Sequence, residues 1–138
     1  MLARIRKAME EKDEGFTLIE LLVVIIIIGI LAAIAIPVFL NQRNNGYRAT
    51  LKSDLKNAAT AVESYGADNN GQYTGASLGA GAVAGNVEFN RSANVTVEIV
   101  GANGTSYCLK ATDSRLGTSE PWYYDKATGV PSKTACTA

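Results

Sequence analysis

Hydrophobic residues are distributed unevenly along this chain, and one long apolar stretch dominates its first third. Between Leu21 and Gln42 there is no charged residue over 22 positions. As an α-helix this stretch would be about 33 Å long at about 1.5 Å per residue, and the hydrocarbon core of a bilayer is about 30 Å thick. A buried helix of a soluble domain normally keeps a polar face. The pattern therefore predicts a helix that crosses a membrane.

After Pro37 the pattern becomes one-sided, with apolar residues at steps of three and four and polar residues around them. This spacing predicts that the helix continues and lays its apolar stripe against a sheet, so we expect one long helix from about Thr17 to Tyr65. The stripe consists of Tyr47, Leu51, Leu55, Ala58, Val62 and Tyr65, and the polar positions around it include Arg43, Arg48, Lys52, Asp54, Lys56 and Glu63.

The four basic residues of that second half could form a patch for nucleic acid or lipid headgroups. Apart from Tyr47, which belongs to the apolar stripe, no aromatic residue interleaves with Arg43, Arg48, Lys52 and Lys56 in the sequence, whereas surfaces that bind single-stranded nucleic acid combine both residue types. We therefore expect a solvated helix face.

The remainder of the chain has the pattern of a small antiparallel sheet. Residues 66–86 are rich in Gly, Ala and Asn without sustained periodicity, so we expect a loop. In NVTVEIV apolar and polar residues alternate, the turn signal Asn103-Gly104 follows, and SYCLKAT alternates again. PWYYDKATGVP has the form of a further short strand and a turn. The predicted fold class is α+β, with a long N-terminal helix packed on a sheet of three or four strands. The predicted inward positions are Val95, Val97 and Ile99 in the first strand and Tyr107, Leu109 and Ala111 in the second.

Two residues inside the apolar stretch disfavour a regular helix. Gly29 has low helix propensity, and Pro37 removes a hydrogen bond and crowds the carbonyl of Ala33. They predict a helix break, a place where the helix bends or unwinds when it packs. The alternative is that both are tolerated breakers of a membrane helix.

The composition gives no support for an enzyme. The chain contains no histidine, the commonest general base. GANGTS lacks the lysine and the spacing of a phosphate loop. With 13 basic and 13 acidic residues the formal net charge is zero, so nucleic acid is not expected as a primary ligand. Asp113, Glu120 and Asp125 match no calcium loop. We expect no catalytic site, no cofactor and no metal site.

The residues before the apolar stretch indicate how the chain is processed. Arg4, Arg6 and Lys7 favour a cytoplasmic N-terminus and an exported C-terminus. An ordinary signal peptide has an apolar core of about 7–15 residues followed by a small-residue cleavage site, which this stretch does not match. The hydrophilic piece instead ends at Gly15-Phe16, and a cut there would leave the apolar helix on the mature protein.

The sequence GFTLIELLVVIIIIGILAAIAIP, residues 15–37, resembles the type III signal of type IV pilins and their pseudopilin relatives. That signal has a glycine, then a phenylalanine, then an acid at the fifth position after the cut, within an apolar helix. The resemblance implies that a membrane-embedded prepilin peptidase cleaves after Gly15 and N-methylates Phe16. It implies a leader of residues 1–15, a membrane and filament-core helix of residues 16–42, an amphipathic stem of residues 43–65 and a globular head of residues 66–138.

Glu20 is the one acid carried into the apolar helix, and a carboxylate in a bilayer is costly and usually functional. Cleavage gives Phe16 an α-amine that can carry a positive charge. This amine could neutralise Glu20 within one subunit, since the two residues lie one turn apart, or in a neighbouring subunit. Only contact with a neighbour selects a register between subunits. The alternative is that Glu20 is solvated at headgroup level.

Two cysteines, Cys108 and Cys136, lie in the last third of the chain. In a cytosolic domain the two cysteines would more often be buried thiols, whereas export to an oxidising compartment favours a disulfide. The bridge would close 29 residues counting both ends and would contribute about 2–4 kcal/mol. By the resemblance, Gly117 to Ala135 is the region displayed on the surface.

The chain is therefore interpreted as the precursor of a pilus subunit. The expected partners are further copies of the chain in a helical filament, prepilin peptidase, the assembly platform and minor pilins. It would reside in the cytoplasmic membrane before assembly and at the cell surface afterwards, with adhesion, motility or DNA uptake as uses. One alternative is a pseudopilin of a type II secretion or competence system. Another is a single-span membrane protein whose exported head binds a ligand.

Overall fold

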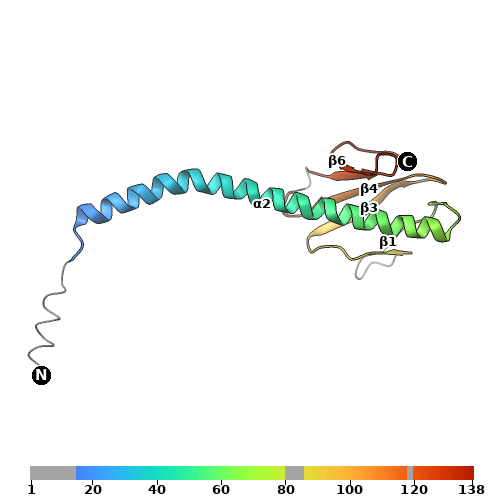
Figure 1. The fold of residues 1–138 in the computed structure, drawn as a ribbon, viewed down its shortest axis with the longest axis horizontal. Helices are drawn as coiled ribbons and strands as arrows, with labels where there is room; N and C mark the ends of the chain where they lie inside the picture. The colour runs from blue at the N-terminus through green and yellow to red at the C-terminus, as the bar shows by residue number, and fades with distance from the viewer. Residues whose placement is uncertain (1–14, 80–85, 118–119) are drawn as a thin grey trace, which may run out of the picture. The chain divides into compact units, whose positions relative to one another are not determined.

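The computed structural model describes residues 15–79, 86–117 and 120–138. Over these residues the chain forms one helix and six strands (Figure 1). The chain divides between Asn41 and Gln42 into two units, which are described separately below. The elements are α2 (Leu18–Asp68), β1 (Leu78–Gly79), β2 (Val87–Glu88), β3 (Val95–Ala102), β4 (Tyr107–Asp113), β5 (Trp122–Asp125) and β6 (Pro131–Ser132).

In the N-terminal unit, the first part of α2 exposes its large hydrophobic side chains. The exposed fraction runs from 42% at Leu22 to 84% at Leu18. Among the described residues, α2 is the one helix long and apolar enough to cross a membrane. Such a surface needs an apolar cover, because exposed apolar patches of this size are rare on soluble monomers.

The helix continues through both of its predicted weak points. Residues 18–68 are helical without interruption, and Pro37 lies inside the helix. A Cβ built on Gly29 would meet nothing within 4 Å. Neither residue therefore ends the helix in the single subunit, and local unwinding on packing stays a prediction.

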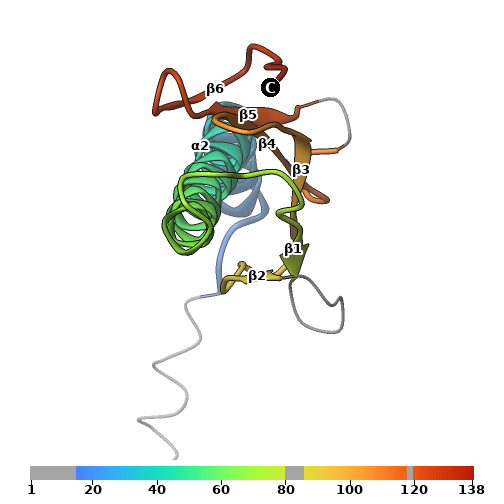
Figure 2. The same cartoon turned by 90° about the vertical axis from the view of Figure 1, so that its right-hand side faces the viewer.

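In the C-terminal unit, the second part of α2 lies along one face of a four-stranded antiparallel sheet of order β3-β4-β5-β6 (Figure 2). Leu51, Leu55 and Val62 are fully buried in the shared core. Burying one such side chain stabilises a fold by about 1.5–3 kcal/mol. The sheet contributes Val95, Val97, Tyr107, Leu109 and Ala111 to this core. The predicted stripe is confirmed from Leu51 to Tyr65, and the predicted inward strand positions are confirmed, whereas Tyr47 lies outside this core.

The turn between β3 and β4 lies where the sequence predicted it. Asn103 N donates to Ser106 O at 2.9 Å, and the Asn103 side chain accepts from the backbone of Thr105 at 3.1 Å and of Ser106 at 2.9 Å. This is turn formation by an Asn side chain that bonds the backbone ahead of it.

The predicted loop of residues 66–86 is wrong at its start and is interrupted by the short strand β1. The helix runs three residues past Tyr65, to Asp68, and stops where Asn70 and Gly71 take positive φ. Further on, β1 pairs in parallel with β2. The Asn86 side chain holds this pair, since it accepts from Ser77 N at 2.7 Å and donates to Gly75 O at 2.8 Å.

Gly66 lies near the end of α2, at a position where a side chain would collide with a neighbouring ring. It is buried, and a Cβ at this position would overlap the ring of Tyr73. We expect Gly66→Ala to destabilise the C-terminal unit by about 1–3 kcal/mol, as overpacking does. Urea unfolding of the full chain in detergent, followed by near-ultraviolet circular dichroism, measures the change.

The matched control is Gly46→Ala in the same helix. A Cβ there would meet nothing within 4 Å, so the higher helix propensity of alanine should stabilise by about 0.5–1 kcal/mol. Equal effects of the two substitutions would contradict the proposed role of Tyr73.

Candidate functional site

The predicted cleavage and methylation site lies immediately before α2. Gly15, Phe16 and Thr17 precede the helix, and Phe16 is 88% exposed. A Cβ on Gly15 would meet nothing within 4 Å, so within the part of the chain that the structure describes no contact requires a glycine there. Residues 1–14 of the predicted leader lie outside the described residues. An exposed, non-helical Gly15-Phe16 bond is accessible to a protease.

Glu20 takes part in a helix cap that the sequence analysis missed. Its Oε2 accepts from Thr17 N and from Thr17 Oγ1, each at 3.3 Å, and its own N–H donates to Thr17 Oγ1 at 3.3 Å. This reciprocal pair is a capping box, in which a Thr at the helix cap and a Glu three residues later satisfy each other's backbone donors. The Thr-x-x-Glu spacing before an apolar run was the signal for it.

The cap leaves room for the predicted charge pair. Both contacts use Oε2, and Oε1 accepts no hydrogen bond from the described residues. A positive α-amine on Phe16 would lie at the positive end of the helix dipole, where cations are disfavoured and carboxylates favoured. A cut before Phe16 would therefore create a cation that needs a negative partner. Glu20, one turn away, has a carboxylate oxygen that is free to be that partner. The structure contains one chain, so the contact between subunits stays a prediction.

The expectation of a solvated basic face on α2 is wrong for Arg48 and Lys52. Arg48 Nε donates to Glu120 Oε2 and Nη2 to Glu120 Oε1, both at 2.8 Å. Lys52 Nζ lies 4.1 Å from the centre of the Trp122 ring. Both partners lie about seventy positions away in the sequence, so Lys52 meets an aromatic ring, and Arg48 a carboxylate, that the helix pattern alone did not indicate.

Two acids assigned to the polar side of the stripe also have partners in the C-terminal unit. Asp54 is 3% exposed and accepts from Ser92 N at 2.8 Å and Ser92 Oγ at 3.1 Å. Glu63 accepts from the hydroxyls of Tyr73 and Tyr107. Burial and the bond to Glu63 raise the pKa of Tyr107 well above its ordinary value, so this hydroxyl remains a donor. These carboxylates fasten the helix to the rest of the unit.

Cys108 and Cys136 form a disulfide, the pairing that export favoured. Cys108 is fully buried on β4, and the bridge joins the last residues of the chain to the middle of the sheet. Between the cysteines, residues 127–130 and 133–135 are exposed. Display of Gly117 to Ala135 on a filament surface stays a prediction.

The three acids considered for calcium each have a partner within the chain. Asp113 accepts from Arg115 Nε at 2.9 Å and from Arg115 Nη2 at 2.6 Å. Glu120 is bound by Arg48, and Asp125 Oδ1 accepts from Ala127 N at 2.8 Å. In the described ranges no group of three or more His, Cys, Asp or Glu residues could hold a metal ion.

The buried acid Asp113 makes the stability of this unit dependent on pH. It is 1% exposed, and the hydrogen bonds from Arg115 hold its pKa below the usual value despite burial. A carboxyl whose pKa is depressed on folding contributes stability above its unfolded pKa, and that contribution disappears as pH falls through the folded pKa. Arg48 lowers the pKa of Glu120 in the same direction.

We therefore expect the unfolding midpoint to fall as the pH drops below the ordinary carboxyl range. Asp113→Asn should be less stable than the unmodified protein at neutral pH and should lose less on acidification. Urea unfolding at neutral and strongly acidic pH measures both. A variant with the full acid dependence of the unmodified protein would contradict the assignment to Asp113.

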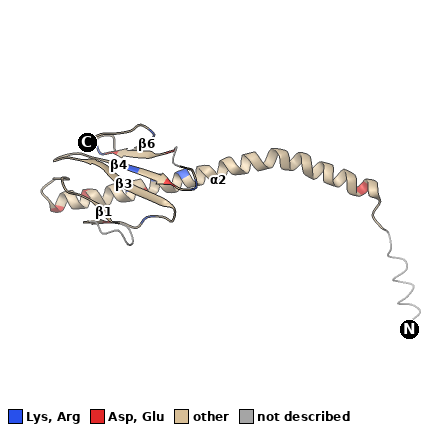
Figure 3. Ribbon diagram, turned by 180° about the vertical axis from the view of Figure 1, so that it is seen from behind, with Lys and Arg blue, Asp and Glu red and all other residues tan. Residues whose placement is uncertain are grey.

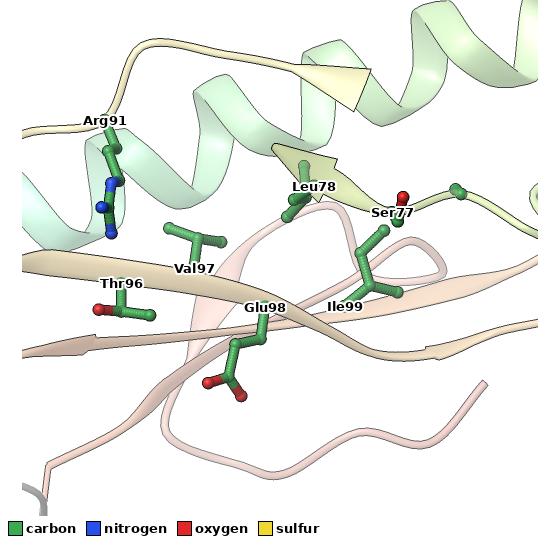
Figure 4. Close-up of a pocket in the computed structure, with 8 residues that line it drawn as sticks. Ser77, Leu78, Arg91, Thr96, Val97, Glu98 and Ile99 are labelled. Atoms are coloured by element: carbon green, nitrogen blue, oxygen red, sulfur yellow. The ribbon is translucent and has the colours of Figure 1, made fainter. Parts of the chain in front are cut away.

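A shallow pocket lies between β1 and β3 (Figure 4). Leu78, Val97 and Ile99 line it, with Arg91 at one end. Figure 4 shows Glu98 and Thr96 pointing to the opposite side of β3 from Val97. The pocket is formed by apolar side chains that point inward from the edge of the sheet. Its lining residues do not place a nucleophile beside a base.

Comparison with known proteins decides the family. A family profile described as "Prokaryotic N-terminal methylation motif" matches residues 12–36. The "Type IV wide pilus major component PilA4" of Thermus thermophilus is 43% identical over 101 residues, which is 73% of this chain and 74% of that protein. The chain belongs to the type IV pilin family. The matched segment is about four times as long as the N-terminal motif, so this pilin resembles that relative in the head as well.

Other relatives match this pilin over a shorter length. The "Type IV major pilin protein PilA" of Myxococcus xanthus is 48% identical over 54 residues, 39% of this chain and 24% of that protein. The "Type II secretion system core protein G" of Pseudomonas aeruginosa is 40% identical over 58 residues, 42% of this chain and 41% of that protein. The pilin covers less than half of each of these two proteins.

Proposed function

We propose that this pilin is the major structural subunit of a type IV pilus, taken into a helical filament from the cytoplasmic membrane after removal of residues 1–15. The observation that carries the proposal is the similarity over 101 residues to a protein named as a major component of a type IV pilus. The same subunit would have no enzyme activity and would need no cofactor.

The exposed apolar surface of α2 supports both stages of this life cycle. Before assembly, a bilayer covers the side chains between Leu18 and Leu40, with the N-terminus on the cytoplasmic side. After assembly, the same side chains contact the helices of neighbouring subunits in the filament core. Because such contacts join different faces of identical subunits, they continue without closing and produce a fibre.

The charge at the start of the helix sets the register of these contacts. Prepilin peptidase cleaves after Gly15 and methylates the new amine on Phe16, which remains able to carry a positive charge. In the filament this amine contacts Glu20 of a neighbouring subunit through Oε1, while Oε2 keeps the cap with Thr17. An axial shift between subunits would leave both charges unpaired in an apolar core, which is strongly unfavourable.

The C-terminal unit forms the outside of the filament. The disulfide fixes the segment between Cys108 and Cys136, and its exposed residues face partners and solvent. Adhesion, surface motility and DNA uptake are uses compatible with such a surface. Minor pilins and the assembly platform are the expected protein partners.

A pseudopilin is the second candidate, since the type II secretion protein is 40% identical to this chain over 58 residues. The longer match to the pilus component favours a pilus. A single-span membrane protein with a ligand-binding head is the third candidate. It would keep residues 1–15 in the mature chain.

The intact mass of protein sheared from the cell surface tests the proposal. We expect a chain that begins at Phe16, carries one added methyl group and lacks two hydrogens because of the disulfide. Recovery of the same mature chain from the envelope alone, with none in the sheared fraction, would favour the pseudopilin. A mature chain beginning at Met1 would contradict both.

A further inference from the structure

Cations and aromatic rings gather in the C-terminal unit around the first turns of α2 after Gln42. Arg115 Cζ lies 4.0 Å and Arg43 Cζ 5.5 Å from the centre of the Tyr47 ring. Lys52 Nζ lies 4.1 Å and Lys133 Nζ 5.8 Å from the centre of the Trp122 ring. We call this group the basic aromatic belt; it consists of Arg43, Tyr47, Lys52, Arg115, Trp122 and Lys133.

The belt carries an excess of positive charge although its surroundings contain acids. Asp113 pairs with Arg115 at 2.6 Å, and Glu120 pairs with Arg48 at 2.8 Å and lies 3.9 Å from Lys133. With Arg48 included, five basic side chains face two acidic ones, which leaves three positive charges. Arg43 is exposed, and the side chain of Lys133 is 59% exposed, so these two cations are available to a ligand.

The position of the belt along the chain indicates what that ligand is. No charged residue lies between Leu21 and Gln42, so this stretch of α2 is uniformly tan in Figure 3. Arg43 follows directly in the same helix. At about 1.5 Å per residue, Tyr47 lies only about 6 Å further along α2 and Lys52 about 14 Å, so Lys52 lies beyond the headgroups but within the roughly 10 Å over which an anionic surface acts. The headgroup layer on each side of a bilayer is about 5–8 Å thick. A helix that places residues 21–42 in hydrocarbon therefore places Arg43 and Tyr47 among the headgroups.

We propose that the basic aromatic belt binds anionic phospholipid headgroups on the exported face of the membrane. This inference rests on the proposed residence of the pilin in the membrane before assembly. Arg and Lys side chains pair with the phosphates, while Tyr47 has the amphipathic ring that membrane interfaces favour. The belt holds the head of the unassembled pilin at the bilayer surface. Lipid is favoured over nucleic acid because the belt begins where the apolar stretch ends.

Trp122 provides a local probe, because it is the only tryptophan of the chain. The full chain is reconstituted into vesicles rich in phosphatidylglycerol or made of phosphatidylcholine alone, each doped with lipid that carries a nitroxide quencher on its headgroup. We expect quenching of Trp122 to be at least about twofold greater in the anionic vesicles and to fall as salt screens the surface charge.

The matched variants each remove two positive charges. Arg43→Gln with Lys133→Gln should abolish the difference between the two vesicle types. Lys56→Gln with Lys110→Gln changes two lysines outside the belt and should preserve it. Equal quenching of the unmodified protein in both vesicle types, or equal loss in both double variants, would overturn the inference.

Two further measurements distinguish a failure of this inference from a failure of the proposed function, and lipid binding from nucleic-acid binding. Resistance of the protein to alkaline extraction from both vesicle types reports membrane insertion, so its loss would contradict the proposed function instead. Binding of a fluorescent single-stranded oligonucleotide to the detergent-solubilised chain reports the rival ligand. Loss of that binding in Arg43→Gln with Lys133→Gln, with lipid quenching unchanged, would identify a nucleic-acid surface and overturn the lipid assignment.

Discussion

Replacement of Glu20 by glutamine is expected to leave the pilin in the membrane and to stop it from polymerising. Glutamine at this position of a capping box still accepts from Thr17 N–H, so the start of α2 is preserved while the negative charge is lost. A hydrogen bond to a charged group contributes about 1.5–3 kcal/mol, which corresponds to at least about a tenfold loss for each subunit added. The ratio of sheared filament protein to membrane protein measures the effect.

The matched control separates the charge of Glu20 from its role in the cap. Thr17→Ala removes the Oγ1 contacts, at a cost of about 0.5–2 kcal/mol in helix stability, and keeps the carboxylate. We expect Thr17→Ala to assemble. Filaments from Glu20→Gln at the unmodified level, or an equal defect in Thr17→Ala, would show that the charge does not direct assembly.

Replacement of Gly15 by valine is expected to block processing, and with it assembly. Within the described residues no contact places a demand on Gly15, since a Cβ there has open space, so the requirement would come from the protease cleft. A β-branched side chain before the cut restricts the backbone and adds bulk. Intact mass should show the whole chain from Met1 retained in the membrane fraction, with filament protein reduced below detection.

Gly46→Ala is a suitable control for this experiment, because it also adds a methyl group in open space and lies far from the cut in sequence. It should be processed and assembled normally. Valine-containing precursor that is cleaved to begin at Phe16 at the usual rate would contradict the assigned cleavage position.

The parts of the fold that follow a local pattern were predictable from the sequence. The uncharged stretch from Leu21 to Gln42 indicated the apolar half of α2, because helix length and bilayer thickness are fixed quantities. The three-and-four spacing through Leu51, Leu55 and Val62 identified the buried stripe. Alternation on either side of Asn103-Gly104 identified the β3–β4 hairpin and its inward residues.

The contacts that were missed join residues far apart in the sequence. Asp54 has the position of a surface acid on the helix, and only the approach of Ser92 makes it a buried acceptor. Arg48 has the position of a solvated cation until Glu120 meets it. The β1–β2 pair depends on the side chain of Asn86, which no strand pattern indicates. Chain topology determines which polar residues meet, and periodicity carries no information about it.

The candidate site was predictable in outline and incomplete in detail. The Gly15-Phe16 bond and Glu20 were identified from the motif, and the capping box of Thr17 was overlooked although its spacing was visible. That omission affects the mechanism, because it shows that Glu20 has a partner before any cut. In the proposed mechanism the amine of Phe16 is therefore expected to contact the second carboxylate oxygen, Oε1.

The most direct test of the central claim is a distance measurement inside filaments assembled from two differently labelled batches of subunits. One batch carries ¹⁵N at the Phe16 amine and the other carries ¹³C at the Glu20 carboxyl group, so any solid-state magnetic resonance correlation between them has to cross a subunit boundary. We predict a strong correlation in the mixed filaments. A correlation that is seen only when both labels are on the same chain would contradict pairing between neighbours.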